Sequence, residues 1–218
     1  MDLKTFELLI FDLDGTLVDS QKDLANAVNF VRKNYGFEEI ATATVRSYLG
    51  DGISSLLEKS LPVKNVKLLK EAIEKFKSFY AIHLTDTTIL YNCVKETLEV
   101  LNRQRGKTLV LLSNKSQKFC FEILKRLGIL DFFKEVWGGD TLAKKPDPKP
   151  ILELAKITNS ALESTIIIGD SPNDFLAAKN AKISFVAAEY GYCSLEQIKT
   201  FNPDFSIKSI NQLLEILV

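Results

Sequence analysis

The stretch ELLIFDLDGT, at residues 7–16, decides the fold, because an apolar run stops there at an Asp-Gly-Thr turn. A short continuous apolar run that ends at turn-forming residues predicts a buried strand. Two later runs repeat the design, KTLVLLS at residues 107–113 and TIIIG at residues 165–169, and a helix-like pattern follows each of them. Such strands are typical of parallel sheets covered by helices. The sequence therefore predicts an α/β fold with a doubly wound parallel sheet.

A helical insert is predicted between the first and second of these runs. Over residues 18–88, apolar side chains recur at the spacing of amphipathic helices. They are Leu24, Val28, Val31 and Tyr35, followed by Leu69, Ile73, Phe76 and Tyr80. We expect a core domain at residues 1–17 and 89–218 and a helical cap domain at residues 18–88. Ser20 and Asp23 have the spacing of a capping box for the first helix of the insert.

Composition and charge argue against several classes of protein. Lys plus Arg and Asp plus Glu both number 28, and no basic stripe with interleaved aromatic residues is present, so we expect no nucleic-acid partner. No apolar run is long enough to cross a membrane, and the first residues lack the pattern of a signal peptide. The three cysteines contain no C-x-x-C pair. We expect a cytoplasmic protein without a membrane partner, as a monomer or a homodimer.

Acidic or hydrogen-bonding residues close each predicted strand. Asp12 and Asp14 follow the first strand, Ser113 and Asn114 the second, and Asp170 the third. In open α/β sheets ligands bind outside the carboxyl ends of the strands, so these side chains should share one crevice. Carboxylates gathered in one crevice repel one another unless a cation neutralises them. Oxygen ligands favour a hard ion, and the charges alone therefore predict a bound Mg²⁺.

Four short motifs resemble, in the same order, those of the haloacid dehalogenase (HAD) superfamily. They are Asp12-Leu13-Asp14-Gly15-Thr16, Ser113-Asn114, Lys145 before Pro146, and Gly169-Asp170 with Asp174. The helical insert resembles the cap domain of that superfamily. Within it, Gly50-Asp51-Gly52 looks like the loop that reaches over the active site in the phosphoglycolate phosphatase-like subgroup. One departure is Tyr91-Asn92-Cys93-Val94, where this subgroup usually has Tyr-Pro-Gly-Val.

This resemblance implies an HAD-like core that acts as a Mg²⁺-dependent phosphomonoester hydrolase through an aspartyl-phosphate intermediate. Asp12 would be the nucleophile, and Asp14 would be the general acid and base. The carboxylates of Asp12 and Asp170 and the main-chain oxygen of Asp14 would bind Mg²⁺, and Asp174 would lie behind these ligands. The implied substrate is a small phosphorylated metabolite whose leaving group is recognised by the cap.

Other residues of the motifs would bind the substrate. The resemblance gives catalytic roles to the Ser113 hydroxyl and the Lys145 ammonium, which would hold phosphate oxygens during phosphoryl transfer. Lys144 is an equally basic neighbour, but the lysine of the family directly precedes proline, and this favours Lys145. The expected substrate-binding residues are Ser113, Asn114, Lys145, Gly50, Asp51 and Gly52.

Two other functions stay open for the same motifs. A β-phosphoglucomutase-like mutase shares the core but must exclude water and rephosphorylate its intermediate. A binding protein that kept the fold and lost activity is the second alternative, although every implied catalytic residue is present. Asp174 also has a structural interpretation, because it falls in the first turn of a predicted helix, where an acidic residue is favourable for the helix dipole.

Overall fold

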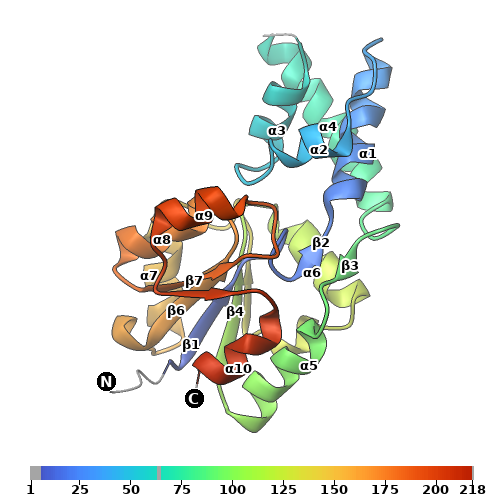
Figure 1. The fold of residues 1–218 in the computed structure, drawn as a ribbon. Helices are drawn as coiled ribbons and strands as arrows, with labels where there is room; N and C mark the ends of the chain where they lie inside the picture. Colours follow the sequence, from blue (N-terminus) through green and yellow to red (C-terminus); the bar gives the residue numbers. More distant parts are fainter. Residues whose placement is uncertain (1–5, 63–64, 218) are drawn as a thin grey trace.

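The computed structural model describes residues 6–62 and 65–217, and six parallel strands form one sheet within them (Figure 1). The strand order is β5-β4-β1-β6-β7-β8, so the chain starts mid-sheet and extends to both edges. This arrangement confirms the predicted doubly wound α/β fold. Residues 1–5 and 218 of the expected core and residues 63–64 of the expected cap lie outside the described residues. The strands are β1 (Leu8–Phe11), β4 (Thr108–Leu112), β5 (Glu135–Trp137), β6 (Thr165–Gly169), β7 (Ser184–Ala188) and β8 (Phe205–Ile207).

Strand β1 is buried on both faces of the sheet, which explains its continuous apolar sequence. Because successive side chains point to opposite faces of a strand, Leu9 and Phe11 pack in one hydrophobic cluster, and Leu8 and Ile10 pack in another. One cluster is covered by helices α5 (Val94–Glu99), α6 (Gln117–Arg126) and α10 (Leu213–Ile216). The other is covered by α7 (Lys149–Ile157), α8 (Pro172–Ala181) and α9 (Leu195–Phe201). Shorter turns are the π-helix Val100–Gln104 and the 3₁₀ turns Leu130–Phe132, Leu162–Ser164 and Ile210–Gln212.

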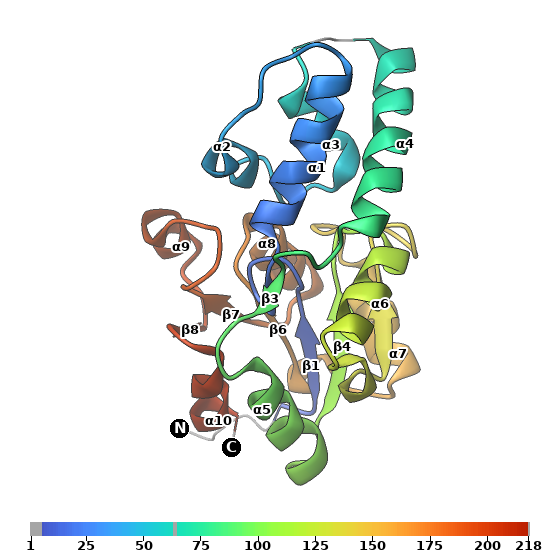
Figure 2. The same ribbon diagram turned by 90° about the vertical axis from the view of Figure 1, so that its right-hand side faces the viewer.

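A group of helices stands beyond the carboxyl ends of the strands (Figure 2). It consists of α1 (Gln21–Asn34), α2 (Thr42–Arg46), α3 (Ile53–Ser60) and α4 (Val66–Ile82). The chain enters and leaves this group through two short antiparallel strands, β2 (Val18–Asp19) and β3 (Ile89–Leu90). We propose that this strand pair marks the boundary between the core at residues 1–17 and 89–218 and the cap at residues 18–88.

The predicted capping box of Ser20 and Asp23 is wrong. Ser20 makes no capping bond to its helix, and its hydroxyl instead donates to Oδ1 of Asp14. Asp23 accepts bonds from the main-chain N–H groups and the hydroxyls of Thr87 and Thr88, just before β3. Burial raises the pKa of Asp23, but these hydrogen bonds lower it more, so the net pKa lies below its ordinary value. Asp23 thus ties the first cap helix to the distant segment before β3, and Ser20 ties it to Asp14 after β1.

Membrane insertion through a helix is not supported by the described residues. None of the helices they form combines the length and the apolar character that crossing a bilayer requires.

Candidate active site

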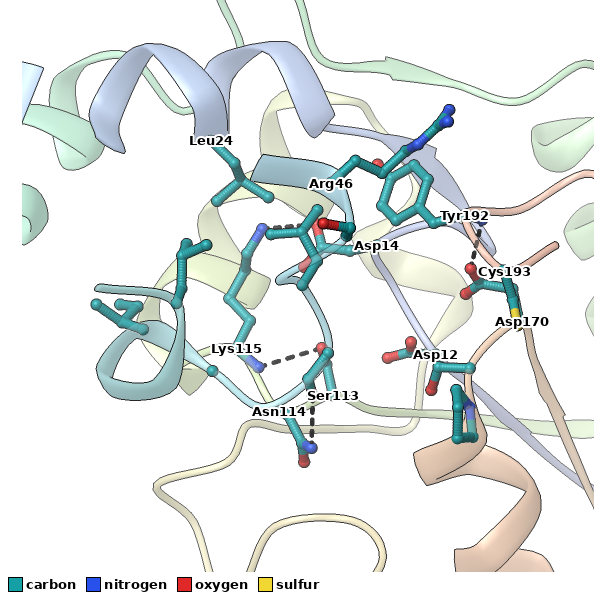
Figure 3. A pocket seen from close by; sticks show the side chains of 18 of the residues that line it. Asp12, Asp14, Leu24, Arg46, Ser113, Asn114, Lys115, Asp170, Tyr192 and Cys193 are labelled. Atoms are coloured by element: carbon teal, nitrogen blue, oxygen red, sulfur yellow. Dashed lines mark hydrogen bonds and ion pairs between the residues drawn. The ribbon is translucent and has the colours of Figure 1, made fainter. Parts of the chain in front are cut away.

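Three aspartates meet at the carboxyl ends of β1 and β6. Asp12, Asp170 and Asp174 each offer a carboxylate oxygen, and these oxygens lie within 4.8 Å of one another. Figure 3 shows Asp12 and Asp170 close together on the floor of a cavity. Asp174 comes from the first turn of α8, where its Oδ2 accepts a bond from the Ser171 N–H at 3.0 Å. The expected convergence of strand-terminal carboxylates is therefore present for Asp12 and Asp170, and Asp174 joins them from the helix.

Lys145 neutralises part of this acidic cluster. Its Nζ lies 2.8 Å from Oδ1 of Asp12 and 2.6 Å from Oδ1 of Asp174, and its side chain is only 2% exposed. The Asn114 side chain holds the backbone of Lys145, since its Oδ1 accepts from the Lys145 N–H at 2.8 Å and its Nδ2 donates to the Lys145 carbonyl at 2.9 Å. Lys144 is exposed and does not line the cavity. The structure thus places Lys145, and not its neighbour, beside the nucleophile expected from the sequence.

One lysine does not neutralise the negative charge of three buried carboxylates. Burial is the largest cause that raises the pKa of Asp12, Lys145 opposes it and the nearby Asp174 adds to it, and the net pKa is about 6. Burial, together with repulsion from Asp12 and Asp174, also raises the pKa of Asp170 well above its ordinary value. A divalent cation would reverse both effects, and oxygen donors at this spacing suit a hard ion. The donor set therefore fits the cation that the sequence predicts.

Asp170 is held by Thr16 of the first motif and by Tyr192, which the sequence motifs did not identify. The Thr16 hydroxyl donates to its Oδ1 at 3.1 Å, and the main-chain N–H of Tyr192 donates to its Oδ2 at 2.6 Å. Gly15 leaves space for this carboxylate, because a Cβ at its position would collide with Asp170, and its φ of +83° also favours glycine. The turn after β1 is thus shaped around the carboxylate of Asp170.

Asp14 points away from the acidic cluster toward the cap. Besides the Ser20 hydroxyl, its Oδ1 contacts Nζ of Lys115 at 2.6 Å. Lys115 was missed in the sequence, although it directly follows the Ser113-Asn114 motif. Its side chain is 6% exposed, and its Nζ also donates to the hydroxyl of Tyr80 from α4 at 2.9 Å. The buried Lys115 therefore connects Asp14, the expected general acid and base, to Tyr80 of the cap.

The core and the cap together enclose a cavity of about 390 Å³. Its core-side lining includes Asp12, Asp14, Ser113, Asn114, Lys145 and Asp170, which are all expected site residues. From the expected cap loop, Gly50 and Gly52 line the cavity, but Asp51 does not. The Asp51 carboxylate instead contacts Nζ of Lys59 at 2.8 Å and Nδ2 of Asn173 at 2.9 Å. In this structure Asp51 contacts the cap and core, not the cavity.

Hydrogen bonds fasten this cap loop to the core. The Gly50 carbonyl accepts from Nδ2 of Asn114 at 2.8 Å and from Nδ2 of Asn173 at 3.2 Å. Nζ of Lys144 donates to the Asp51 carbonyl at 3.3 Å. Since Asn114 also holds Lys145, the position of the cap loop is linked to that of the buried lysine. The cap therefore closes over the site through polar contacts that can be broken individually.

The substitution Asn173→Ala should weaken closure of the cap without unfolding the protein. It removes both side-chain bonds from α8 to the loop, one to the Gly50 carbonyl and one to the Asp51 carboxylate. At this partly exposed position the two bonds together are worth about 1–2 kcal/mol, so we expect kcat/KM to fall roughly 5- to 30-fold. Steady-state kinetics on a phosphate ester will measure this. Asn34→Ala is a matched control, because the Asn34 side chain is exposed and, among the described residues, bonds only to the Phe30 carbonyl of its own helix. An equal effect of both substitutions would contradict the role of the loop contacts.

Comparison with known proteins decides the family. A model of the family described as haloacid dehalogenase-like hydrolase matches residues 9–188. The chain belongs to this family. A phosphoglycolate phosphatase of Vibrio vulnificus is 38% identical, over 100% of the chain and 99% of the relative, and one of Aquifex aeolicus is 35% identical, over 96% of each. A crystal structure described as a predicted phosphoglycolate phosphatase from Haemophilus somnus has a TM-score of 0.93 at 31% identity and covers 98% of each chain.

Membership in the haloacid dehalogenase-like family confirms the resemblance drawn from the four motifs. Together with the relatives, it shows that the chain is an enzyme, a phosphatase. The chain spans the whole length of these relatives, cap included. The departures at Tyr91-Asn92-Cys93-Val94 leave the fold intact, with Cys93 in the left-handed region at a φ of 65° before α5.

Proposed function

We propose that this protein hydrolyses the phosphate monoester of a small metabolite, with Asp12 as nucleophile and Mg²⁺ as cofactor. The single observation that supports this most is the meeting of Asp12, Asp170 and Lys145 on the floor of a cavity that the cap covers. A cavity of about 390 Å³ suits a small molecule. The absence of a disulfide among the described cysteines is compatible with our further proposal of a cytoplasmic location.

The residues divide the proposed reaction between them. The Asp12 carboxylate attacks phosphorus, and the bond to the ester oxygen breaks as Asp14 donates a proton to that oxygen. Water then attacks the phosphorus of the aspartyl phosphate, Asp14 takes a proton from this water, and phosphate leaves as Asp12 is regenerated. Ser113 and Lys145 hold the phosphate oxygens throughout.

Mg²⁺ would be held by Asp12, Asp170 and the main-chain oxygen of Asp14. When bound, it would neutralise charge on the phosphate and on the carboxylates around it. Asp174 supports this arrangement from α8, because it holds Lys145 and caps its own helix at the same time. Both interpretations of Asp174, as part of the site and as a helix residue, are therefore compatible with the contacts.

For the substrate, we propose a small phosphorylated acid of the 2-phosphoglycolate type. The relatives from Vibrio vulnificus and Aquifex aeolicus are named phosphoglycolate phosphatase, and the chain matches 99% and 96% of their lengths. Residues of the cap, among them Leu24, Arg46 and Phe76, line the cavity together with the core, and we expect the cap to take part in the selection among phosphate esters. The assignment of one leaving group depends on the residues near Asp14, which are considered below.

Removal of metal should abolish phosphate release. We expect the purified protein to release phosphate from a panel of small phosphate esters in the presence of Mg²⁺. A chelator should lower this activity by a factor of about 100 or more, and restored Mg²⁺ should bring it back. A colorimetric assay of inorganic phosphate will measure this. Undiminished hydrolysis without metal would refute the cofactor, and isomerised sugar phosphate without phosphate release would favour a mutase.

A further inference from the structure

Lys115 and Tyr80 leave two buried donors without acceptors. A lysine ammonium has three N–H donors, and the described residues provide acceptors for two of them, Asp14 Oδ1 and the Tyr80 hydroxyl oxygen. That hydroxyl accepts from Lys115, and its own proton has no acceptor between residues 6 and 62 or 65 and 217. Buried donors are nearly always satisfied in folded proteins. The two unused donors therefore indicate a place for an acceptor that comes with a ligand.

The surroundings make this place a formed site and not an open surface. Tyr80 is fully buried, and its ring packs edge-on against Phe119 of the core with the centroids 5.3 Å apart. Leu24 and Phe76 of the cap line the same cavity. With water largely excluded by apolar walls, a contact between an ammonium and an anion is stronger than it would be at the surface. Lys115 comes from the core and Tyr80 from the cap, so the two groups meet when the cap is closed.

Charge shows what kind of acceptor fits. Lys145 is already shared by Asp12 and Asp174, whereas Asp14 is the acidic partner of Lys115 among the described residues. A neutral acceptor could satisfy one donor, but a carboxylate has two oxygens and can accept from both the ammonium and the hydroxyl. Arg46 also lines the cavity, but it is exposed, and in Figure 3 its guanidinium points away from Lys115.

We propose that Lys115 and Tyr80 form the subsite that binds a carboxylate on the leaving group of the substrate. This rests on the proposed function, in which Asp14 protonates the ester oxygen. An ester oxygen in contact with Asp14 lies next to Nζ of Lys115, which is 2.6 Å from the Asp14 carboxylate. A carboxylate attached to the carbon that bears this oxygen reaches Lys115 and Tyr80. Lys115 and Tyr80 thus select small phosphorylated acids over phosphate esters of equal size whose leaving group is uncharged.

The test compares 2-phosphoglycolate with 2-hydroxyethyl phosphate, an ester of similar size whose leaving group is uncharged. We expect Lys115→Met to lower kcat/KM for 2-phosphoglycolate roughly 30- to 100-fold and to affect 2-hydroxyethyl phosphate far less, because a hydrogen bond to a charged leaving group is lost for 2-phosphoglycolate alone. Tyr80→Phe should lower the same ratio by about 5-fold. Lys118→Met, at an exposed lysine of α6, is the matched control and should leave the ratio unchanged.

Several results would overturn the proposal. An equal loss for both esters would leave Lys115 with a role in positioning Asp14 only. A change of the ratio in Arg46→Met, but not in Lys115→Met, would move the subsite to Arg46. Should Lys115→Met fail to fold, as judged by circular dichroism, Tyr80→Phe decides, since it keeps the aromatic packing and removes only the hydroxyl. An unchanged ratio in Tyr80→Phe would then reject the subsite.

Binding of glycolate separates a failure of the subsite from a failure of the proposed function. Glycolate contains the carboxylate without the phosphate, and its binding, followed by ligand-observed NMR, needs no turnover. We expect the wild-type protein to bind glycolate and the Tyr80→Phe and Lys115→Met variants to bind it more weakly. If the wild type binds glycolate more tightly than both variants but releases phosphate from no ester, the proposed function fails and the subsite stands. If it cleaves both esters and binds no glycolate, the subsite fails alone.

Discussion

Asp12→Asn is expected to lose phosphatase activity by about 10⁴-fold or more while the protein stays folded. An amide has the shape of the carboxylate, but it is not a nucleophile that can form the aspartyl-phosphate intermediate. Burial raises the pKa of Asp12 to about 6, so the metal-free site already disfavours the charged form, and a neutral side chain is tolerated there. We expect the free energy of unfolding to change by less than about 1 kcal/mol. Phosphate release and chemical denaturation will measure the two effects.

Trapping of the phosphoenzyme distinguishes Asp12 from Asp14. Acid quenching of the wild type during turnover should yield a phosphorylated protein, and Asp12→Asn should yield none. Asp14→Asn keeps the nucleophile, so acetyl phosphate, whose leaving group needs little protonation, should still phosphorylate the protein while hydrolysis slows. Asp131→Asn, at an exposed aspartate outside the cavity, is the control for the substitution itself. A phosphoenzyme in Asp12→Asn would assign the nucleophile to another residue.

The fold was predictable because its strongest signals are local. The helix-like pattern that follows residues 165–169 is helix α8 in the structure, since Ser171 caps this helix and Pro172 begins it. The strand at residues 165–169 also keeps its bounds, because an apolar run between turn residues has few alternatives. The meeting of Asp12 with Asp170 followed from strand direction alone, since parallel strands end at the same edge of a sheet. These predictions needed no knowledge of side-chain direction.

The cap contacts were not predictable in the same way, because they join residues far apart in the chain. Ser20 and Asp23 match the local pattern of a capping box, but the bonds from Asp23 to Thr87 span 64 residues, and no local pattern contains them. Lys115 could have been noticed as the residue after a recognised motif, but the sequence does not show that its Nζ reaches Tyr80, 35 positions earlier. Tertiary partners, and not helix propensity, determine these positions.

Lys145→Met should destabilise the metal-free protein severely, in addition to abolishing catalysis. The substitution leaves Asp12 and Asp174 buried beside each other and Asp170 without a compensating charge, and removal of one partner from a buried ion pair costs roughly 3–5 kcal/mol. The Asp174 side chain is 0% exposed, so water cannot solvate its charge. Chemical denaturation will measure the loss. Mg²⁺ should restore part of it, because the cation binds the folded carboxylates and not the unfolded chain.

Lys144→Met is the matched control, since it makes the same change one position earlier. Lys144 is exposed and makes one bond, at 3.3 Å, to the Asp51 carbonyl, so its loss should change stability by less than about 0.5 kcal/mol. A stability loss of equal size in both variants would show that the loop, and not the buried charge, accounts for the effect. A loss in Lys145→Met that Mg²⁺ leaves unchanged would contradict the view that one cation and one lysine share the neutralisation of the same three carboxylates.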